Sequence, residues 1–436
     1  MTTVQKLRNY ISGEMAAGRL KPGDSLPGLR RICNDLGCFY TTAQRAVKEL
    51  GREGVLRIEH GRGAFLTGDQ ALEIEIAWAF DVIERDELAA LIRKHLAGTD
   101  LNLELHLVEI DSPLQENTPP MPRLSVDAHE TGSELNHLPG YEKWKKMLPG
   151  ATLLHLPFTF APHAIGVNLD LMDKIGFPTG RMTRGFQWFA EYAEKAVQAG
   201  FYPMSREFRK IPSMNWALGI LMELSGGRRE ILSGGVPFYT TAAGHLFLEI
   251  ARNTHFYSAM KDTPEEDSFY RGGSGLAPLV GSWITAQNQS KFRPDMRVPH
   301  LGFRNYLLPD GRRLLPTNRQ RLSLRIPEDF DDARLARLAG LIEVLLSKEF
   351  QIDYCRMTGM LSERNDIPYS EYFPMDAESR KLLPGPDSVS ISFSEPYIYP
   401  VMTAMQALLE TALEIPECSE RILQKMDIRK NLDQWQ

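Results

Sequence analysis

The sequence predicts an α/β fold class in two parts, a small head followed by a much larger body. Three observations lead to this prediction. The chain has 436 residues, more than one ordinary core accommodates. Its first fifty residues carry apolar side chains at helical spacing, and a strand–helix–strand pattern starts soon after residue 70. We therefore expect a head over residues 1–68 and a body over 72–436.

Composition excludes several classes of protein. A hydrophobic share of 43% with 24% charged residues is that of a globular chain, not of a disordered one. We find no apolar run of about 18 residues and no signal-peptide core, so we expect a cytoplasmic protein without membrane contact. The cysteines have neither the number of a disulfide framework nor the CxxC spacing of a zinc site; they are Cys33, Cys38, Cys355 and Cys418.

Charge is divided unevenly between the two parts. The chain as a whole has a net charge of −6, but residues 1–68 hold 11 Lys+Arg against 6 Asp+Glu. The head is therefore basic and the body acidic. This asymmetry indicates that the head alone meets a polyanion such as DNA.

The head has the pattern of three helices and a β-hairpin. Val4, Leu7, Ile11 and Met15 form one apolar stripe of a first helix. A second helix is expected from about Gly28 to Leu36, ending before Gly37, and a third over 41–52. The third buries Ala43, Ala46, Val47 and Leu50. Two short strands follow, at 56–58 and 64–66, joined by a Gly-rich turn. This order is that of a winged helix-turn-helix.

The landmarks G.L.PGD.LP, Arg30, LG..YTTAQRAVKEL and EGVLR...GRGAFL occur in order over residues 5–67. With them the head resembles the GntR family of bacterial transcription regulators. The resemblance implies that helix 41–52 enters the major groove and that the wing tip reaches toward the minor groove. The implied DNA-binding residues are Arg30, Tyr40, Thr41, Thr42, Gln44, Arg45 and Arg62. The alternative for the arginines is solvated surface charge.

One position departs from the family pattern. The family usually carries Ser-Arg just before the paired threonines, where this chain has Phe39 and Tyr40. The base contact of that family arginine is therefore missing, and we expect an operator that differs from the family norm.

The body begins with a strand at 74–80, a helix at 87–96 and a strand at 103–110, followed by another strand at 124–126. Later segments then resemble, in order, the sugar-binding proteins of ABC importers over about residues 72–430. The matching segments are 156–158, 167–171, 175–178, 226–227, 281–283, a helix at 333–351 and 359–364. The resemblance implies a two-lobed periplasmic-binding-protein-like domain with crossing strands and a ligand cleft between the lobes.

Candidate ligand-binding residues follow from this resemblance and from their places at strand ends. Trp283 occupies the position of a cleft tryptophan in the family, and its alternative is a buried core ring. For the others, ligand contact and a structural role stay equally open. They are Trp78, Asp81, Asp127, Glu130, Asn215, Trp216 and Arg364. His163 is interpreted as structural.

The leading hypothesis is a ligand-responsive transcription regulator. We expect a homodimer on a pseudo-palindromic operator, with a small-molecule effector of the carbohydrate class that changes its affinity for DNA. We expect no enzymatic activity, no cofactor and no metal. Three alternatives remain: an aminotransferase-like body with pyridoxal phosphate, a glycosidase that uses Asp127 and Glu130, and a ligand-free dimerisation module.

Overall fold

The computed structural model describes residues 3–21, 23–52, 55–59, 62–66, 71–79, 83–110, 121–127, 132–204, 222–226, 241–244, 269, 272–282, 300–328 and 330–392. By its internal contacts the chain divides into two compact units. The smaller holds Met1–Ile74 and Asp100–Leu105, and the larger Glu75–Thr99 and His106–Gln436. The predicted domain boundary at residues 68–72 stays a prediction.

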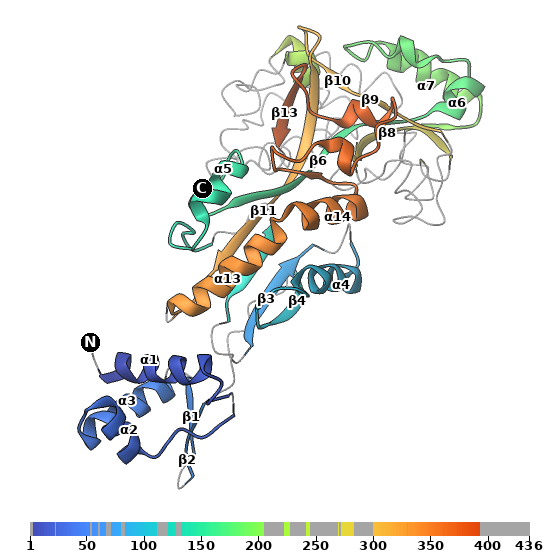
Figure 1. Ribbon diagram of the computed structural model, residues 1–436. Coiled ribbons are helices and arrows are strands. Elements are labelled where there is room, and N and C mark those ends of the chain that lie inside the picture. The colour runs from blue at the N-terminus through green and yellow to red at the C-terminus, as the bar shows by residue number, and fades with distance from the viewer. Residues whose placement is uncertain are drawn as a thin grey trace, which may run out of the picture. The chain divides into compact units, whose positions relative to one another are not determined.

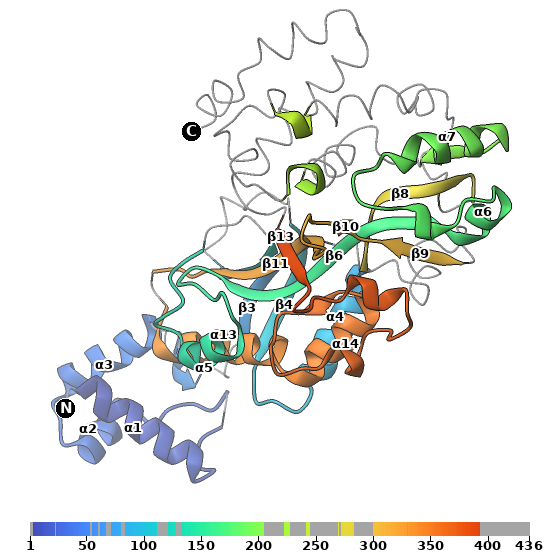
Figure 2. The same ribbon diagram turned by 90° about the horizontal axis from the view of Figure 1, so that it is seen from above.

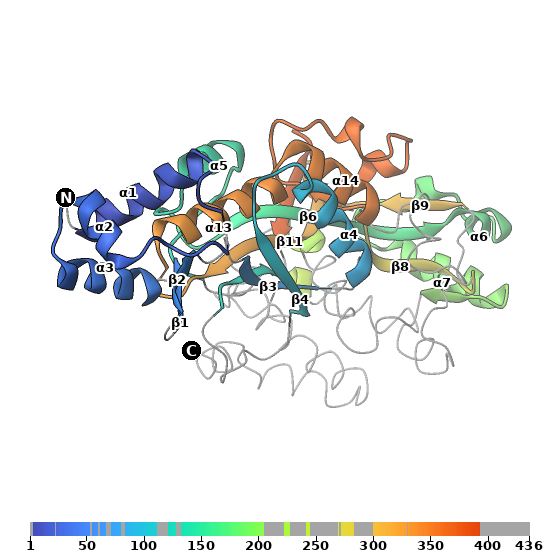
Figure 3. The ribbon, with the colours of Figure 1, turned by 60° about the horizontal axis from the view of Figure 1, so that its bottom comes forward.

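The head has the three helices and the hairpin that the sequence predicts (Figure 3). They are α1 (Thr3–Ala16), α2 (Leu29–Leu36), α3 (Tyr40–Arg52), β1 (Leu56–Glu59) and β2 (Gly63–Leu66). Gly37 ends α2 in the left-handed region, at a φ of 63° that glycine adopts without strain. The two strands pair antiparallel, with Glu59 opposite Gly63. The head has its own apolar core, which includes Leu7, Ile11 and Ile32.

The body is built on one mixed sheet (Figure 1). Its order along the main path is β4-β3-β5-β11-β6-β8-β7. These strands are β3 (Leu72–Trp78), β4 (Leu103–Glu109), β5 (Arg123–Asp127), β6 (Leu156–Asn168), β7 (Tyr202–Met204), β8 (Ser274–Gly281) and β11 (Arg313–Arg325). Shorter strands join it at the sides: β9 (Leu301–Arg304), β10 (Tyr306–Leu307), β12 (Leu361–Ser362) and β13 (Ser388–Ser392).

Strand β6 belongs to both lobes. Its first half, 156–161, pairs with β11, and its second half, from His163, pairs with β8 and β9. Every residue of β6 is buried, which explains its nearly continuous apolar sequence. Strand β11 is shared in the same way, since 313–317 pairs with β13 and 321–325 pairs with β5. Figure 2 shows β6 and β11 side by side at the centre of the body.

Helices accompany each half of the sheet. In the first lobe, α4 (Arg85–Leu96) packs on α13 (Asp332–Leu345) and α14 (Lys348–Thr358). In the second lobe, α6 (Leu169–Lys174) and α7 (Trp188–Gln198) lie beside β8 (Figure 2). The remaining elements of the described residues are α5 (Tyr141–Met147) and three 3₁₀ turns, at Thr179–Arg181, Tyr369–Glu371 and Ser379–Leu382.

One predicted element is wrong. The single helix expected over 333–351 is two helices, because Ser347 starts a new one. Its Oγ accepts a hydrogen bond from the backbone N–H of Phe350 at 3.2 Å, so it caps α14 where an unbroken helix would continue. Within the described residues, no helix is long and apolar enough to cross a membrane.

Candidate functional site

The first turns of α3 present polar side chains to solvent. Burial of Ala43, Ala46, Val47 and Leu50, each at most 7% exposed, fixes the rotation of the helix, as the sequence predicts. Because an α-helix repeats every 3.6 residues, the positions between them must point outward. The exposed side chains of this face are Thr41, Thr42, Gln44 and Arg45. Hydrogen-bond donors and acceptors of this kind can read base edges in a major groove.

The first residue of α3 and the residue before it add an aromatic surface. Phe39 is 84% exposed and Tyr40 51% exposed. Tyr40 also lines a shallow hollow with Arg30, Cys33 and Asn34, so that α2 and the start of α3 share one surface. A phenyl ring left this exposed gains from any surface that removes it from water.

The wing holds its arginines through one carboxylate. Arg62 Nη1 lies 2.8 Å from Glu59 Oε2, and Arg57 Nη2 lies 3.0 Å from Glu59 Oε1. Both guanidiniums also lie over the ring of Phe65, with that of Arg57 5.7 Å and that of Arg62 6.0 Å from its centroid. Glu59 therefore restrains both cations, and a phosphate or base acceptor has to compete with it.

This arrangement predicts the effect of removing that competitor. Glu59→Gln is expected to raise affinity for a mixed-sequence DNA duplex about three-fold at low salt, because Arg57 and Arg62 lose their anionic partner. Fluorescence anisotropy with a labelled duplex measures it. Glu14→Gln is the control, since Glu14, on α1, has nearly the same partial exposure as Glu59 and likewise binds an arginine, Arg19. If Glu59→Gln and Glu14→Gln bind the duplex with equal affinity, Arg57 and Arg62 do not contact DNA.

Trp78 of the predicted ligand set lies in a packed ring cluster. Its side chain is fully buried, and its ring meets Phe158 and Tyr354 edge-on at 5.5 Å in each case. Its Nε1–H donates to the hydroxyl of Tyr354 at 3.3 Å. The structure thus places Trp78 in the core, and a contact with a ligand would require this cluster to open.

Arg364 anchors the turn that carries it. Its guanidinium forms a two-point pair with Asp366, at 2.9 and 2.6 Å, and its Nη1 donates to the carbonyl oxygen of Leu346. That carbonyl lies at the junction of α13 and α14. Of the two roles that the sequence left open, the observed contacts are those of the structural one, and ligand contact stays a prediction.

The other predicted ligand residues are mostly outside the described part of the chain. These are Asp81, Glu130, Asn215, Trp216 and Trp283. The backbone of Asp127 is described, and it pairs with Arg321 of β11. Asp127 therefore lies at the carboxyl end of β5, as predicted. His163 is buried in β6, and this burial lowers its pKa to about 3, so its ring is neutral at physiological pH.

Sequence reasoning missed three charged residues near that strand end. Arg319 and Arg321 lie on β11 where it passes the carboxyl end of β5, and Glu363 follows β12. Arg319 forms an ion pair with Glu363 and lies over the ring of Phe160, 5.2 Å from its centroid. Burial raises the pKa of Glu363, and the two arginines oppose this rise. The alternating Arg-Gln-Arg of 319–321 is visible in the sequence, but its place at the crossing of the lobes is not.

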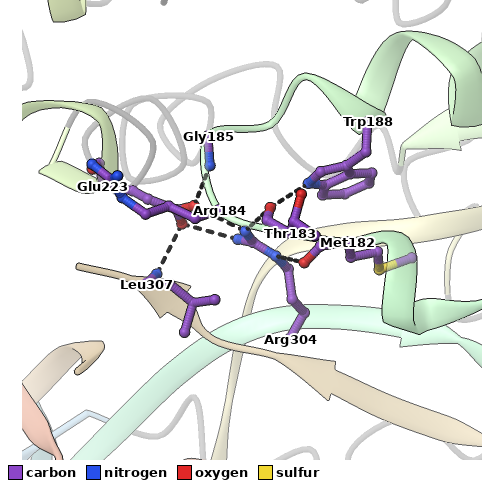
Figure 4. A network of polar contacts seen from close by, with 8 residues as sticks. All are labelled: Met182, Thr183, Arg184, Gly185, Trp188, Glu223, Arg304 and Leu307. Carbon is purple, nitrogen blue, oxygen red and sulfur yellow. Dashed lines mark hydrogen bonds and ion pairs between the residues drawn. The ribbon is translucent and has the colours of Figure 1, made fainter. Parts of the chain in front are cut away.

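A buried ion pair organises the second lobe (Figure 4). The Nη1 and Nη2 atoms of Arg304 donate to both carboxylate oxygens of Glu223, at 3.0 and 2.9 Å. Arg304 is 8% exposed and Glu223 fully buried. The same carboxylate accepts the backbone N–H of Gly185 at 2.8 Å and of Leu307 at 2.9 Å.

The arginine in turn fixes the loop before α7. Its Nε and Nη2 donate to the carbonyl oxygens of Met182 and Thr183, at 3.2 and 2.8 Å. In the same loop Phe186 has a φ of 63°, unusual for a residue other than glycine, and its ring lies 4.4 Å from the guanidinium. Arg304 and Glu223 thus bond to each other and to the backbone of this loop and of β10, and we assign the pair a structural role.

Comparison with known proteins identifies the head. Residues 3–66 match the model of the bacterial regulatory proteins of the gntR family. The transcriptional repressor YtrA of Bacillus subtilis (strain 168), of the helix-turn-helix type, is 32% identical over 89 residues, which cover 20% of this chain and 67% of YtrA. The chain belongs to the gntR family.

The body of this GntR regulator has the fold of two-lobed solute-binding proteins. The cyclic α-maltosyl-1,6-maltose binding protein of Arthrobacter globiformis aligns with a TM-score of 0.58 at 14% identity, over 83% of this chain and 98% of that protein. UgpB of Mycobacterium tuberculosis, solved with glycerophosphocholine, gives 0.58 at 14%, over 84% and 100%. A family 1 solute-binding protein of Bifidobacterium longum subsp. infantis gives 0.54 at 12%, also over 84% and 100%. At such identities the likeness shows the fold alone.

Proposed function

We propose that this GntR regulator binds a pseudo-palindromic operator as a homodimer, and that a carbohydrate bound by its body changes its affinity for DNA. The observation that carries the proposal is the exposed polar face at the start of α3, in one chain with a solute-binding fold. The DNA contacts are those of Arg30, Arg45, Arg62 and the other polar residues named above. The protein acts in the cytoplasm, where its operator is.

The basic head explains why DNA is the partner. Its core fixes α3 with Thr41, Thr42, Gln44 and Arg45 outward, and a helix of this kind meets bases with its N-terminal residues. The twofold symmetry of a homodimer would place two such helices on half-sites one helical turn, or a multiple of it, apart.

The body supplies the sensor. Three similar structures were solved with, or named for, cyclic maltosyl-maltose, glycerophosphocholine and α-D-tagatose, which are two sugars and one glycerol phosphodiester. A carbohydrate can change DNA binding only if it has different affinities for two forms of the regulator. The crossing strands β6 and β11 offer the hinge for such a change. This solute-binding fold favours binding over catalysis, and it gives no support to an aminotransferase-like body.

A two-stage experiment tests the proposal. Selection from a pool of random duplexes first identifies the operator, and fluorescence anisotropy then measures its affinity with each member of a panel of mono- and oligosaccharides. We expect a palindromic consensus and a sugar that changes the Kd at least ten-fold. A selected sequence without symmetry contradicts the homodimer, and an affinity that no sugar changes contradicts the carbohydrate effector.

The exposed ring of Phe39 predicts how the operator is read. An apolar side chain at the start of a recognition helix can contact the methyl group of thymine. Phe39→Ala is expected to weaken binding to the selected operator about five-fold. Replacing thymine by uracil at the contacted position should weaken binding of the original protein by a similar factor and leave the variant unaffected.

The control for this prediction is another exposed apolar residue. Met15 on α1 is 41% exposed, and Met15→Ala should leave both the affinity and the uracil effect unchanged. If uracil weakens binding of the Phe39→Ala variant as much as that of the original protein, Phe39 does not contact the methyl group.

A further inference from the structure

The two arginines of β11 lie where an α/β sheet presents its ligand-binding edge. Strands β3 and β5 are parallel, and Trp78 at the end of β3 pairs with Val126 of β5. Strand β11 runs antiparallel to β5, with Arg321 opposite Asp127. Arg321 is therefore level with the carboxyl ends of β3 and β5, and Arg319 lies two residues beyond them. Ligands of such sheets bind outside the carboxyl ends of the strands.

One carboxylate of the described side chains, that of Glu363, interacts electrostatically with both of these cations. Arg319 is paired with Glu363, and its side chain is still 28% exposed. Arg321 is half-buried, and no carboxylate whose side chain the structure describes lies within ion-pair distance of it. Two neighbours respond to its charge. The pKa of His155 is lowered by burial and then by Arg321, and Arg321 also counteracts the burial-induced rise in the pKa of Glu363.

A half-buried guanidinium has lost part of its hydration, which costs free energy unless a partner replaces it. An anionic group restores that loss, and the planar fork of arginine matches the two oxygens of a carboxylate or a phosphate. Glu363 remains an acceptor for a neighbouring hydroxyl group. The cluster thus combines one site for an anion with one for a sugar hydroxyl.

We propose that Arg321 and Arg319 bind the acidic group of an anionic carbohydrate, the carboxylate of a uronic acid or the phosphate of a sugar phosphate. This inference rests on the proposed function, since it names the chemical class of the effector. An acidic sugar gives the two guanidiniums an anion that a neutral sugar lacks, so the site discriminates between a sugar and its acidic counterpart.

Isothermal titration of the full-length protein with matched pairs tests this inference. The pairs are glucose with glucuronate, galactose with galacturonate, and glucose with glucose 6-phosphate; acetate and inorganic phosphate are titrated alone. The expected result is that one acidic sugar binds at least ten-fold more tightly than its neutral partner and than the free anion. Raising the salt concentration should weaken that binding.

Variants of Arg321 test whether this residue causes the preference for the acidic sugar. Arg321→Gln should abolish the preference for the acidic sugar, and Arg321→Lys should retain it in weaker form, because lysine keeps the charge and loses the fork. Arg325→Gln is the matched control, since Arg325 is exposed at the far end of the same strand. Circular dichroism establishes that each variant is folded before titration.

The outcomes separate this inference from the function on which it rests. Tighter binding of a neutral sugar, an unchanged preference in Arg321→Gln, or equal binding of inorganic phosphate overturns the inference and leaves a carbohydrate-responsive regulator in place. If the panels of neutral and acidic sugars both fail to bind, the carbohydrate effector is overturned as well.

Discussion

Replacing Glu223 by Ala is expected to lower the free energy of unfolding of the body by about 3 to 5 kcal/mol. The substitution leaves the guanidinium of Arg304 buried without its counter-charge, and it removes the acceptor of two backbone N–H groups, those of Gly185 and Leu307. Burying such groups unpaired is among the most destabilising single changes. Urea denaturation followed by circular dichroism measures the loss.

An exposed pair of the same lobe is the control for this prediction. Glu191 binds Arg181 at the surface, where the two side chains are 49% and 55% exposed, so Glu191→Gln should cost less than about 1 kcal/mol. The double variant Glu223→Leu with Arg304→Met should recover part of the loss, because it removes both charges. A loss below about 1 kcal/mol in Glu223→Ala would mean that this ion pair does not hold the lobe together.

Replacing Arg45 by Ala is expected to weaken binding to the selected operator about ten-fold or more, the usual effect of losing a base or phosphate contact. Arg45 is exposed on the same face of α3 as Thr41 and Thr42. Anisotropy at several salt concentrations measures the affinity and the slope of log K against log salt. The slope falls by about one unit if Arg45 contacts a phosphate.

A second substitution at the same position separates the two kinds of contact. Arg45→Lys keeps the charge and loses the two-point fork, so it preserves binding at a phosphate but relaxes base preference at a guanine. Lys6→Ala on α1 controls for the loss of one positive charge, because Lys6 is also exposed. If the Arg45→Ala and Lys6→Ala variants bind the operator with equal affinity, Arg45 does not contact DNA.

The fold of the head could be predicted from the sequence almost to the residue. Its signals are local: the apolar stripe with Leu7 and Ile11, and Gly37 at the end of α2. Each of these signals lies within one or two turns of the element that it defines. What spacing could not show is that Glu59 holds both wing arginines, because that contact depends on side-chain conformation.

The body was predictable in its first strands and in its family resemblance, but not in its site. The predicted strand end at Asp127 is confirmed, and the strand predicted over 74–80 is present but ends at Trp78. The helix break at Ser347 was missed, since a serine inside an apolar pattern also suits an unbroken helix. Arg321 and Asp127 are nearly 200 residues apart in the chain. Only the pairing of their strands brings them together, and periodicity within one segment carries no information on such pairing.

The shared strand β6 has a consequence for synthesis of the protein. Its partners β8, β9, β11 and β12 all follow it by more than a hundred residues, so this mostly apolar strand leaves the ribosome long before they do. The head, whose core lies within residues 7–66, is complete by then. At typical rates of translation, roughly 15 to 50 seconds separate the end of the head from the end of β11. During that interval the nascent chain presents a finished DNA-binding head without a sensor to control it, and an uncovered apolar strand that chaperones are suited to protect.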